Sequence, residues 1–358
     1  MTHTDIATIR LNSQQISTTT FKSAKQLVAF MGAMQAQDYA MAKWGVGVRL
    51  PKLTDKQVQE AIDKGEILRT HVMRPTWHFV AADDISWMLE LTAPRIRASL
   101  KSRQAELGLS EPIIAKSFSV MEKAMTGNNH ITREQLHAEL GKIKIPTNEN
   151  RLSHLMMYAE LDGLVCSGVI KNNKQTYALL EERVKKKKKF SKEEALAELA
   201  KRYFLSHGPA TINDFIWWSG LSVSDARRGL ELVKSNFYSE IIDSETYWFS
   251  DAITPTQKNK QQVYLLPAFD EFLISYKKRT ASLPAEHHVK AVSFNGIFYP
   301  TIVINGKVTG LWKRTIKKEK VLIETNFFSA PDKATKHLIE ERAQAFGHFL
   351  GKEAIIQY

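Results

Sequence analysis

A short polar segment early in the sequence carries side chains that could stabilise a cation during a reaction. It consists of Met34, Gln35, Ala36, Gln37 and Asp38. In extended backbone, residues two apart share a face, so the amides of Gln35 and Gln37 would point into one cleft, each with a donor pair and an acceptor. In the alternative, the segment is a helix end whose glutamines bond nearby backbone. Asp38 could assist a water molecule in the reaction. Alternatively, it could have a structural role, by capping a helix or forming an ion pair.

Other common catalytic patterns are absent from the sequence. It contains no P-loop, no strand-linked dinucleotide-binding glycine pattern, no HExxH motif and no serine-hydrolase elbow. His71 and His78 are seven apart in a strand-like segment and would lie on opposite faces. Cys166, the only cysteine, lies in an apolar run and suits a buried position. We therefore expect no metal site and no cofactor.

The sequence has a clear excess of positive charge. Its 358 residues include 50 Lys and Arg against 38 Asp and Glu, which gives a net charge of +12. Such a field attracts polyanions such as nucleic acid or an acidic membrane surface. No apolar stretch is long enough to span a membrane, no signal peptide is visible, and the single cysteine fits a reducing compartment. We expect a cytoplasmic protein that does not associate with membranes.

A run of cations marks the clearest module boundary. Lys185 to Lys189 follow Arg183, and so many like charges would repel one another inside a packed domain, which indicates a linker or an exposed strand end. Ser191 and Glu194 then form the pattern of a capping box ahead of an apolar helical stretch. A new helix and a new module are predicted to begin there.

The region after this boundary has the order of a known supersecondary unit. Residues 211–218 are predicted to form a short helix, and a second helix begins at Ser222. Residues 238–249 contain two strand-like runs around a polar turn. Helix, turn, helix and β-wing is the order of a winged helix.

The same order occurs twice earlier in the sequence. Helices predicted at 131–140 and 151–161 precede two strands that flank the polar turn 171–174. A still earlier region fits the scheme with helices at 23–34 and 55–64 and strands after them. We therefore expect three copies of one unit.

Beyond residue 260 the sequence changes to short strands and one late helix, 332–346. Asn305-Gly306 is a hairpin-turn signal. The strands are expected at 263–266, 289–294, 299–304, 307–312 and 321–326. The whole chain is thus expected to be an α+β protein in which three winged helices, at 1–106, 107–189 and 190–257, precede a compact β-domain at 258–358.

Four motifs occur in order over almost the whole chain: Met34–Asp38, His71–Val80, Leu266–Phe272, and Tyr299–Thr301 with Gly310 and Trp312. Together they resemble the AlkZ-like family of winged-helix DNA glycosylases. The resemblance implies tandem winged helices around a central channel, followed by a β-barrel-like domain. It also implies a catalytic glutamine, aliphatic residue, glutamine signature, which Gln35, Ala36 and Gln37 match. The YcaQ-like branch has aspartate where this chain has Gln37.

The implied activity is that of a monofunctional glycosylase that removes N7- or N3-alkylated purines in base excision repair. Such a base is a cationic leaving group that needs little acid assistance, and positive charge develops on the sugar. Two amide oxygens can stabilise that cation and orient a water molecule without a titrating residue. The expected partner is alkylated double-stranded DNA, bound by a monomer that associates with the nucleoid when it is on DNA.

DNA contacts are predicted at basic residues in the second helices of two winged helices, after the Leu266–Phe272 motif, and at a hairpin. These are Arg151, His154, Arg227, Arg228, Lys277, Lys278, Arg279 and Lys307. The main alternative function is a non-enzymatic DNA-binding protein or transcription regulator, because winged helices and positive charge alone predict only binding. An RNA-binding protein or a structural scaffold is a third alternative.

Overall fold

The computed structural model describes residues 1–250 and 261–358. This part of the chain divides into two compact units. The first unit holds residues 1–59 and 196–218 together with the described part of 222–358, and the second holds 60–195 and 219–221. The predicted boundary between 257 and 258 lies outside the described residues, and the four predicted modules stay a prediction. Among the described helices, none has the length and apolarity needed to cross a membrane.

The winged-helix order predicted after residue 190 is present. Ser191 and Glu194 form the expected capping box, and the Ser222 hydroxyl accepts the Asp225 N–H at 3.0 Å. Asp243 and Ser244, at φ +49° and +64°, make the turn between the two paired strands. The elements are α11 (Lys192–His207), α12 (Ile212–Ser219), α13 (Val223–Val233), β7 (Tyr238–Ile242) and β8 (Glu245–Phe249).

The second unit contains the same kind of module with a three-stranded sheet of order β4-β6-β5. Its helix α8 begins two residues later than predicted, because Ile131 and Thr132 pair with β6 and Thr132 then caps the helix. Its core includes Met121, Leu136 and Leu155, all fully buried. The elements are α7 (Glu111–Met125), β4 (Ile131–Thr132), α8 (Arg133–Lys142), α9 (Arg151–Leu161), β5 (Val165–Ser167) and β6 (Thr176–Leu179).

The remaining elements of the second unit are a β-hairpin and three helices. These are β2 (Ile67–Val72), β3 (Arg74–Ala81), α5 (Ile85–Ser99), α6 (Lys101–Glu106) and α10 (Leu180–Arg183). The cationic run that follows α10 has no regular structure, as expected for a linker. It is nevertheless anchored, because the Lys188 ammonium pairs with Asp84 at 2.9 Å and its N–H donates to the Asp83 carbonyl at 2.8 Å.

The first sixty residues contain α1 (His3–Ser13), α2 (Ala24–Met31), β1 (Met34–Gln35), α3 (Tyr39–Arg49) and α4 (Asp55–Asp63). Helix α2 is shorter than predicted, because Gly32 ends it at φ +78°. Helix α3 is not predicted from the sequence, since Gly45 and Gly47 argue against a helix. Gly47 is required there: a Cβ would lie 2.5 Å from a ring carbon of Phe349.

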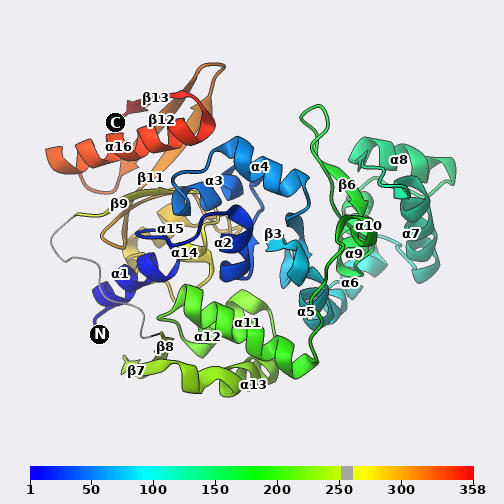
Figure 1. The fold of residues 1–358 in the computed structure, drawn as a ribbon, viewed down its shortest axis with the longest axis horizontal. Helices are drawn as coiled ribbons and strands as arrows, with labels where there is room; N and C mark the ends of the chain where they lie inside the picture. The colour runs from blue at the N-terminus through cyan, green and yellow to red at the C-terminus, as the bar shows by residue number, and fades with distance from the viewer. Residues whose placement is uncertain (251–260) are drawn as a thin grey trace. The chain divides into compact units, whose positions relative to one another are not determined.

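The C-terminal domain is a five-stranded sheet of order β13-β12-β11-β10-β9, with α16 (Lys333–Leu350) packed along it (Figure 1). Neighbouring strands are antiparallel except β12 and β13. The predicted strand 289–294 is wrong: α15 (His288–Ala291) occupies its first half, and a four-residue helix, α14 (Glu271–Ile274), follows β9. The strands are β9 (Val263–Leu266), β10 (Thr301–Ile304), β11 (Lys307–Ile316), β12 (Lys320–Phe327) and β13 (Glu353–Gln357).

Candidate active site

The two candidate catalytic glutamines lie just beyond the end of α2, in the first unit. Gln35 is the last residue of β1 and is 7% exposed, Ala36 is fully buried, and Gln37 is exposed in the bend that leads to α3. Because α2 ends at Met31, the segment is a short strand and a bend rather than the helix end of the alternative interpretation. One glutamine is therefore held in the protein while the other reaches the surface.

Asp38 caps the helix that follows the glutamines. One of its carboxylate oxygens accepts the Met41 N–H at 3.1 Å, as the N-cap of α3. The other lies 3.5 Å from a guanidinium nitrogen of Arg314, on β11. Both structural roles considered for Asp38 are thus observed, and Arg314 joins the site although no sequence pattern pointed to it.

A buried carboxylate that the sequence analysis does not identify holds the Gln35 backbone. Glu271, at the start of α14, is 1% exposed, and its Oε1 accepts the Gln35 N–H at 2.6 Å. Its Oε2 accepts the indole N–H of Trp218 at 3.2 Å and the hydroxyl of Ser275. Glu271 therefore fixes the backbone position of Gln35, the first candidate catalytic residue. The only sequence signal was its place in the Leu266–Phe272 motif.

Glu271 is ionised in this environment. Burial on its own would raise the pKa of Glu271, but His207 and the donors Ser275 and Gln35 outweigh it and lower the pKa to about 2. Burial lowers the pKa of His207, whose Nε2 lies 3.7 Å from Glu271 Oε2, and this favours a neutral imidazole.

The residue before Glu271 forms a second buried anchor. The Asp270 carboxylate accepts hydrogen bonds from both terminal nitrogens of the Arg49 guanidinium, at 2.8 and 2.9 Å. It also caps α14. Arg49 further donates to the backbone carbonyls of Gln14 and Gly45 and to the Gln14 side chain. This cluster ties α3, which begins at Asp38, to α14, which begins at Glu271.

Three of the predicted DNA-contact residues are presented at the surface of the first unit. Arg227 and Arg228 are exposed on α13, in the second helix of the helix-turn-helix, and Lys277 is exposed just after α14. Cations exposed at these positions are accessible to a phosphate of the DNA backbone.

The other predicted contacts in the first unit are engaged within the protein. Lys278 pairs with Glu245 at 2.8 Å. Arg279 donates to the Leu273 carbonyl at 3.0 Å, and its guanidinium lies 5.3 Å from the ring centre of Trp217. Lys307 is half-buried and donates to the Ala281 carbonyl at 2.6 Å, and burial lowers the pKa of Lys307. The expectation that Lys307 lines a phosphate channel does not fit this inward-directed ammonium.

Arg151 and His154 lie on α9 of the second unit and are also engaged. Arg151 donates to the Leu107 carbonyl at 2.8 Å and pairs with Glu149 at 2.7 Å. The His154 ring lies beside Tyr158 in a tilted arrangement, with the ring centres 6.1 Å apart, and burial lowers the pKa of His154. Both side chains contribute to packing around the start of α9.

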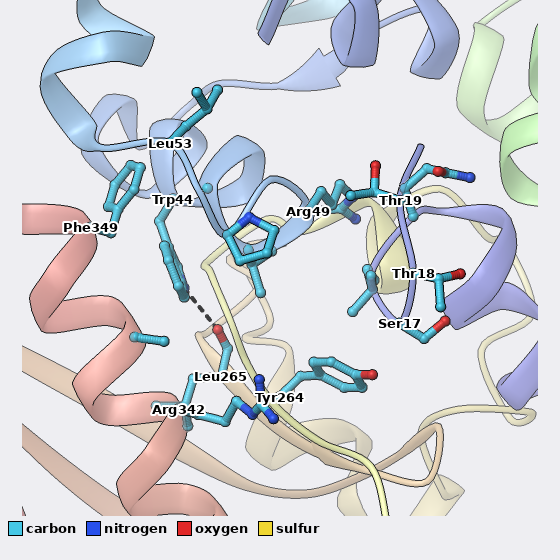
Figure 2. Close-up of a pocket in the computed structure, with 16 residues that line it drawn as sticks. Ser17, Thr18, Thr19, Trp44, Arg49, Leu53, Tyr264, Leu265, Arg342 and Phe349 are labelled. Carbon is cyan, nitrogen blue, oxygen red and sulfur yellow. Dashed lines mark hydrogen bonds between the residues drawn. The ribbon is translucent and has the colours of Figure 1, made fainter. Parts of the chain in front are cut away.

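A cavity of about 190 Å³ lies at the opposite end of α3 from Asp38 (Figure 2). Trp44, Tyr264 and Phe349 form aromatic walls, and Thr18 and Arg342 add polar groups. The Trp44 indole N–H donates to the Leu265 carbonyl at 2.8 Å, which fixes one wall. Gln35, Gln37 and Asp38 are not among its lining residues, so this cavity is separate from the candidate active site.

Metal-binding and thiol chemistry find no support among residues 1–250 and 261–358. No group of three His, Cys, Asp or Glu side chains in that part of the chain could hold a metal ion. Cys166 is fully buried, and burial raises the pKa of Cys166 to about 12, so the thiol is not a nucleophile. His71 contacts the buried Glu160 carboxylate rather than a second histidine.

Comparisons with known proteins identify a family and a fold for this chain. A family model described as DNA glycosylase AlkZ-like matches residues 28–349, which include both the Gln35–Gln37 segment and Glu271. An interstrand DNA cross-link repair glycosylase of Streptomyces sahachiroi is 23% identical over 320 residues, 85% of each chain. The solved structure of Streptomyces sahachiroi DNA glycosylase AlkZ matches with a TM-score of 0.81 and 19% identity over all of both chains. The chain therefore shares that fold.

Proposed function

This chain belongs to the AlkZ-like DNA glycosylase family, and we propose that it hydrolyses the N-glycosidic bond of N7- or N3-alkylated purines in double-stranded DNA. The observation that carries the proposal is the anchored Gln35–Gln37 segment, in which a buried carboxylate fixes one amide residue and the other reaches the surface. We propose further that the protein acts as a cytoplasmic monomer.

The chemistry asks little of the protein beyond charge stabilisation. The alkylated purine carries a positive charge and leaves with the electron pair of the glycosidic bond, which neutralises it. The sugar becomes oxocarbenium-like, a water oxygen bonds to the anomeric carbon, and that water releases one proton to the solvent. Fixed amide dipoles stabilise the cation and orient that water at no reorganisation cost.

Each residue of the segment has a distinct part in this mechanism. Gln35 is assigned to the sugar cation, because its backbone is held by Glu271 and it is nearly buried. Gln37 is assigned to the attacking water, because it is exposed to solvent. Asp38 is a positioning residue: it fixes the start of α3 while its carboxylate is engaged by Met41 and Arg314.

The name of the Streptomyces relative points to a second substrate, an interstrand cross-link. A cross-link that joins two alkylated purines presents the same cationic leaving group, so the proposed mechanism would apply to it. We therefore include a cross-linked duplex as a second substrate in the test.

The decisive experiment is single-turnover release of 7-methylguanine from a duplex with one such base. Gln35→Ala and Gln37→Ala should each slow release roughly 10²- to 10³-fold, the cost of losing one preorganised dipole. DNA affinity and the thermal melt should stay near those of the wild type. Gln37→Asp should retain partial activity, since a carboxylate keeps the acceptor beside the sugar cation.

The matched control is Gln344→Ala, which removes an exposed glutamine from α16 and should leave the rate unchanged. Alanine variants that excise at the wild-type rate would contradict the catalytic assignment. A wild-type protein that binds undamaged duplex tightly but releases no base would instead favour the non-enzymatic DNA-binding alternative.

A further inference from the structure

The Gln35 N–H is bound by a charged group that is almost completely buried. Glu271 is 1% exposed, and burying a carboxylate carries a large desolvation cost. Its two oxygens offset part of this cost by accepting hydrogen bonds from Gln35, Trp218 and Ser275. The charge therefore lies one hydrogen bond from the Gln35 backbone.

No Lys or Arg side chain of the described residues forms an ion pair with the Glu271 carboxylate. Within the described residues, His207 is its only ion-pair partner within 4 Å, and burial lowers the pKa of that histidine. The buried guanidinium of Arg49 is paired through two nitrogens with the neighbouring residue Asp270. The remaining neighbours, the Ser275 hydroxyl and the Trp218 indole, are neutral donors.

The position of the charge is fixed from several sides. The donors to its two oxygens come from β1, α12 and the residue just after α14. Ser275 is itself fixed, because its carbonyl accepts the Tyr203 hydroxyl at 3.0 Å. A charge held in this way needs no rearrangement when a cation forms nearby, which is the condition for electrostatic preorganisation.

We infer that Glu271 is a positioning residue that supplies the negative charge stabilising the sugar cation, acting through the Gln35 backbone without touching the substrate. The inference rests on the proposed glycosylase function and deepens it. It explains how a site with two neutral amides stabilises a full positive charge: the carboxylate lies one hydrogen bond behind the first amide residue. In a partly buried site, a unit charge roughly 8–10 Å from the developing cation changes the rate by about 10- to 30-fold.

The test uses Glu271→Gln, which keeps the acceptor for the Gln35 N–H and removes the charge. Two duplexes serve as probes, one with a cationic pyrrolidine in place of the sugar and one with a neutral tetrahydrofuran. The wild type should bind the cationic duplex at least tenfold more tightly than the neutral one. In Glu271→Gln this preference should fall by about 10- to 30-fold or vanish, and 7-methylguanine release should slow by a similar factor. Affinity for undamaged duplex should not change.

Glu341→Gln is the matched control, because it removes one negative charge from the exposed face of α16 in the same unit. It should retain the full cationic preference. A Glu271→Gln variant that keeps the preference would overturn the inference. Should that variant fail to fold, a wild type that binds both duplexes equally would overturn it as well. A wild type that prefers the cationic duplex but releases no alkylated base would refute the proposed function alone.

Discussion

The buried ion pair between Arg49 and Asp270 leads to a sharp prediction about stability. The substitution Asp270→Asn preserves the side-chain volume, removes the negative charge and turns one acceptor into a donor. The Arg49 guanidinium is 0% exposed and bonded to both carboxylate oxygens, so its charge would be left buried and uncompensated. We expect a large fall in the free energy of unfolding.

The magnitude follows from the burial of both partners. Removing one member of a buried, hydrogen-bonded ion pair costs about 3–5 kcal/mol. Asp270 also accepts the Phe272 N–H at 2.9 Å as the cap of α14, but asparagine caps helices about as well, so this contribution is small. A loss of about 4 kcal/mol lowers Tm by roughly 8–16 °C for a domain of this size.

Urea denaturation followed by tryptophan fluorescence measures the effect, with a thermal melt alongside. The control is Glu231→Gln, which breaks the exposed pair with Lys234 on α13 and should change the free energy by less than about 0.5 kcal/mol. A loss below about 1 kcal/mol in Asp270→Asn would show that the carboxylate is not what compensates Arg49, and the anchoring of α3 to α14 described here would be wrong.

Four further outcomes are expected. Gly306→Ala should cost roughly 1–3 kcal/mol in urea denaturation, because φ is +79° and a Cβ would lie 2.8 Å from the Ala7 carbonyl carbon. Burial alone would raise the pKa of Glu271, but its partners lower the pKa to about 2. The stabilisation of the folded protein by the ionised carboxylate is therefore complete above pH 4.5, the ordinary pKa of this group, and is lost as the pH falls towards 2. Glu271→Gln should flatten the acid limb of stability against pH in that range. The log of DNA affinity against log salt should have a slope near −5 if about six phosphates are neutralised, and a flat dependence would contradict phosphate binding. EDTA should leave base release unchanged, and restoration by one divalent ion would reveal a missed site.

Elements with strong local signals were predicted well from the sequence. Ser222 caps α13 where expected, and the β7–β8 hairpin turns at Asp243-Ser244. Helix α9 has its predicted bounds, Arg151–Leu161. In each case the residues that begin or end the element are near neighbours in sequence, so the pattern contains the whole reason for the structure.

Elements stabilised by distant contacts were missed or misassigned. Helix α3 contains Gly47, whose lack of a side chain is explained only by the ring of Phe349, about three hundred residues later in the chain. The predicted strand 289–294 has apolar residues, yet Val289 is 80% exposed and Phe294 is fully exposed, so no sheet buries them. Strand β13 was not predicted, since it is short and its parallel partner lies before α16.

The candidate site also contains residues with local sequence signals and residues that are brought together only by distant contacts. Gln35 and Gln37 were predicted to be catalytic from a local spacing and motif, and that assignment stays a prediction. Glu271 acts on Gln35 across 236 residues, and no spacing rule connects the two. Arg314, which pairs with Asp38, is separated from it by a similar length of chain.

The long separation between Gln35 and Glu271 also has a consequence for biosynthesis. Translation at about 5–20 residues per second leaves roughly 10–50 s between the synthesis of the glutamine segment and that of the carboxylate that orders it. During that interval residues 60–195, most of the second unit, emerge and can form their own core. The nascent chain can thus fold a module before Glu271 is available to order the Gln35 segment, so a chain stalled before residue 271 lacks this hydrogen bond.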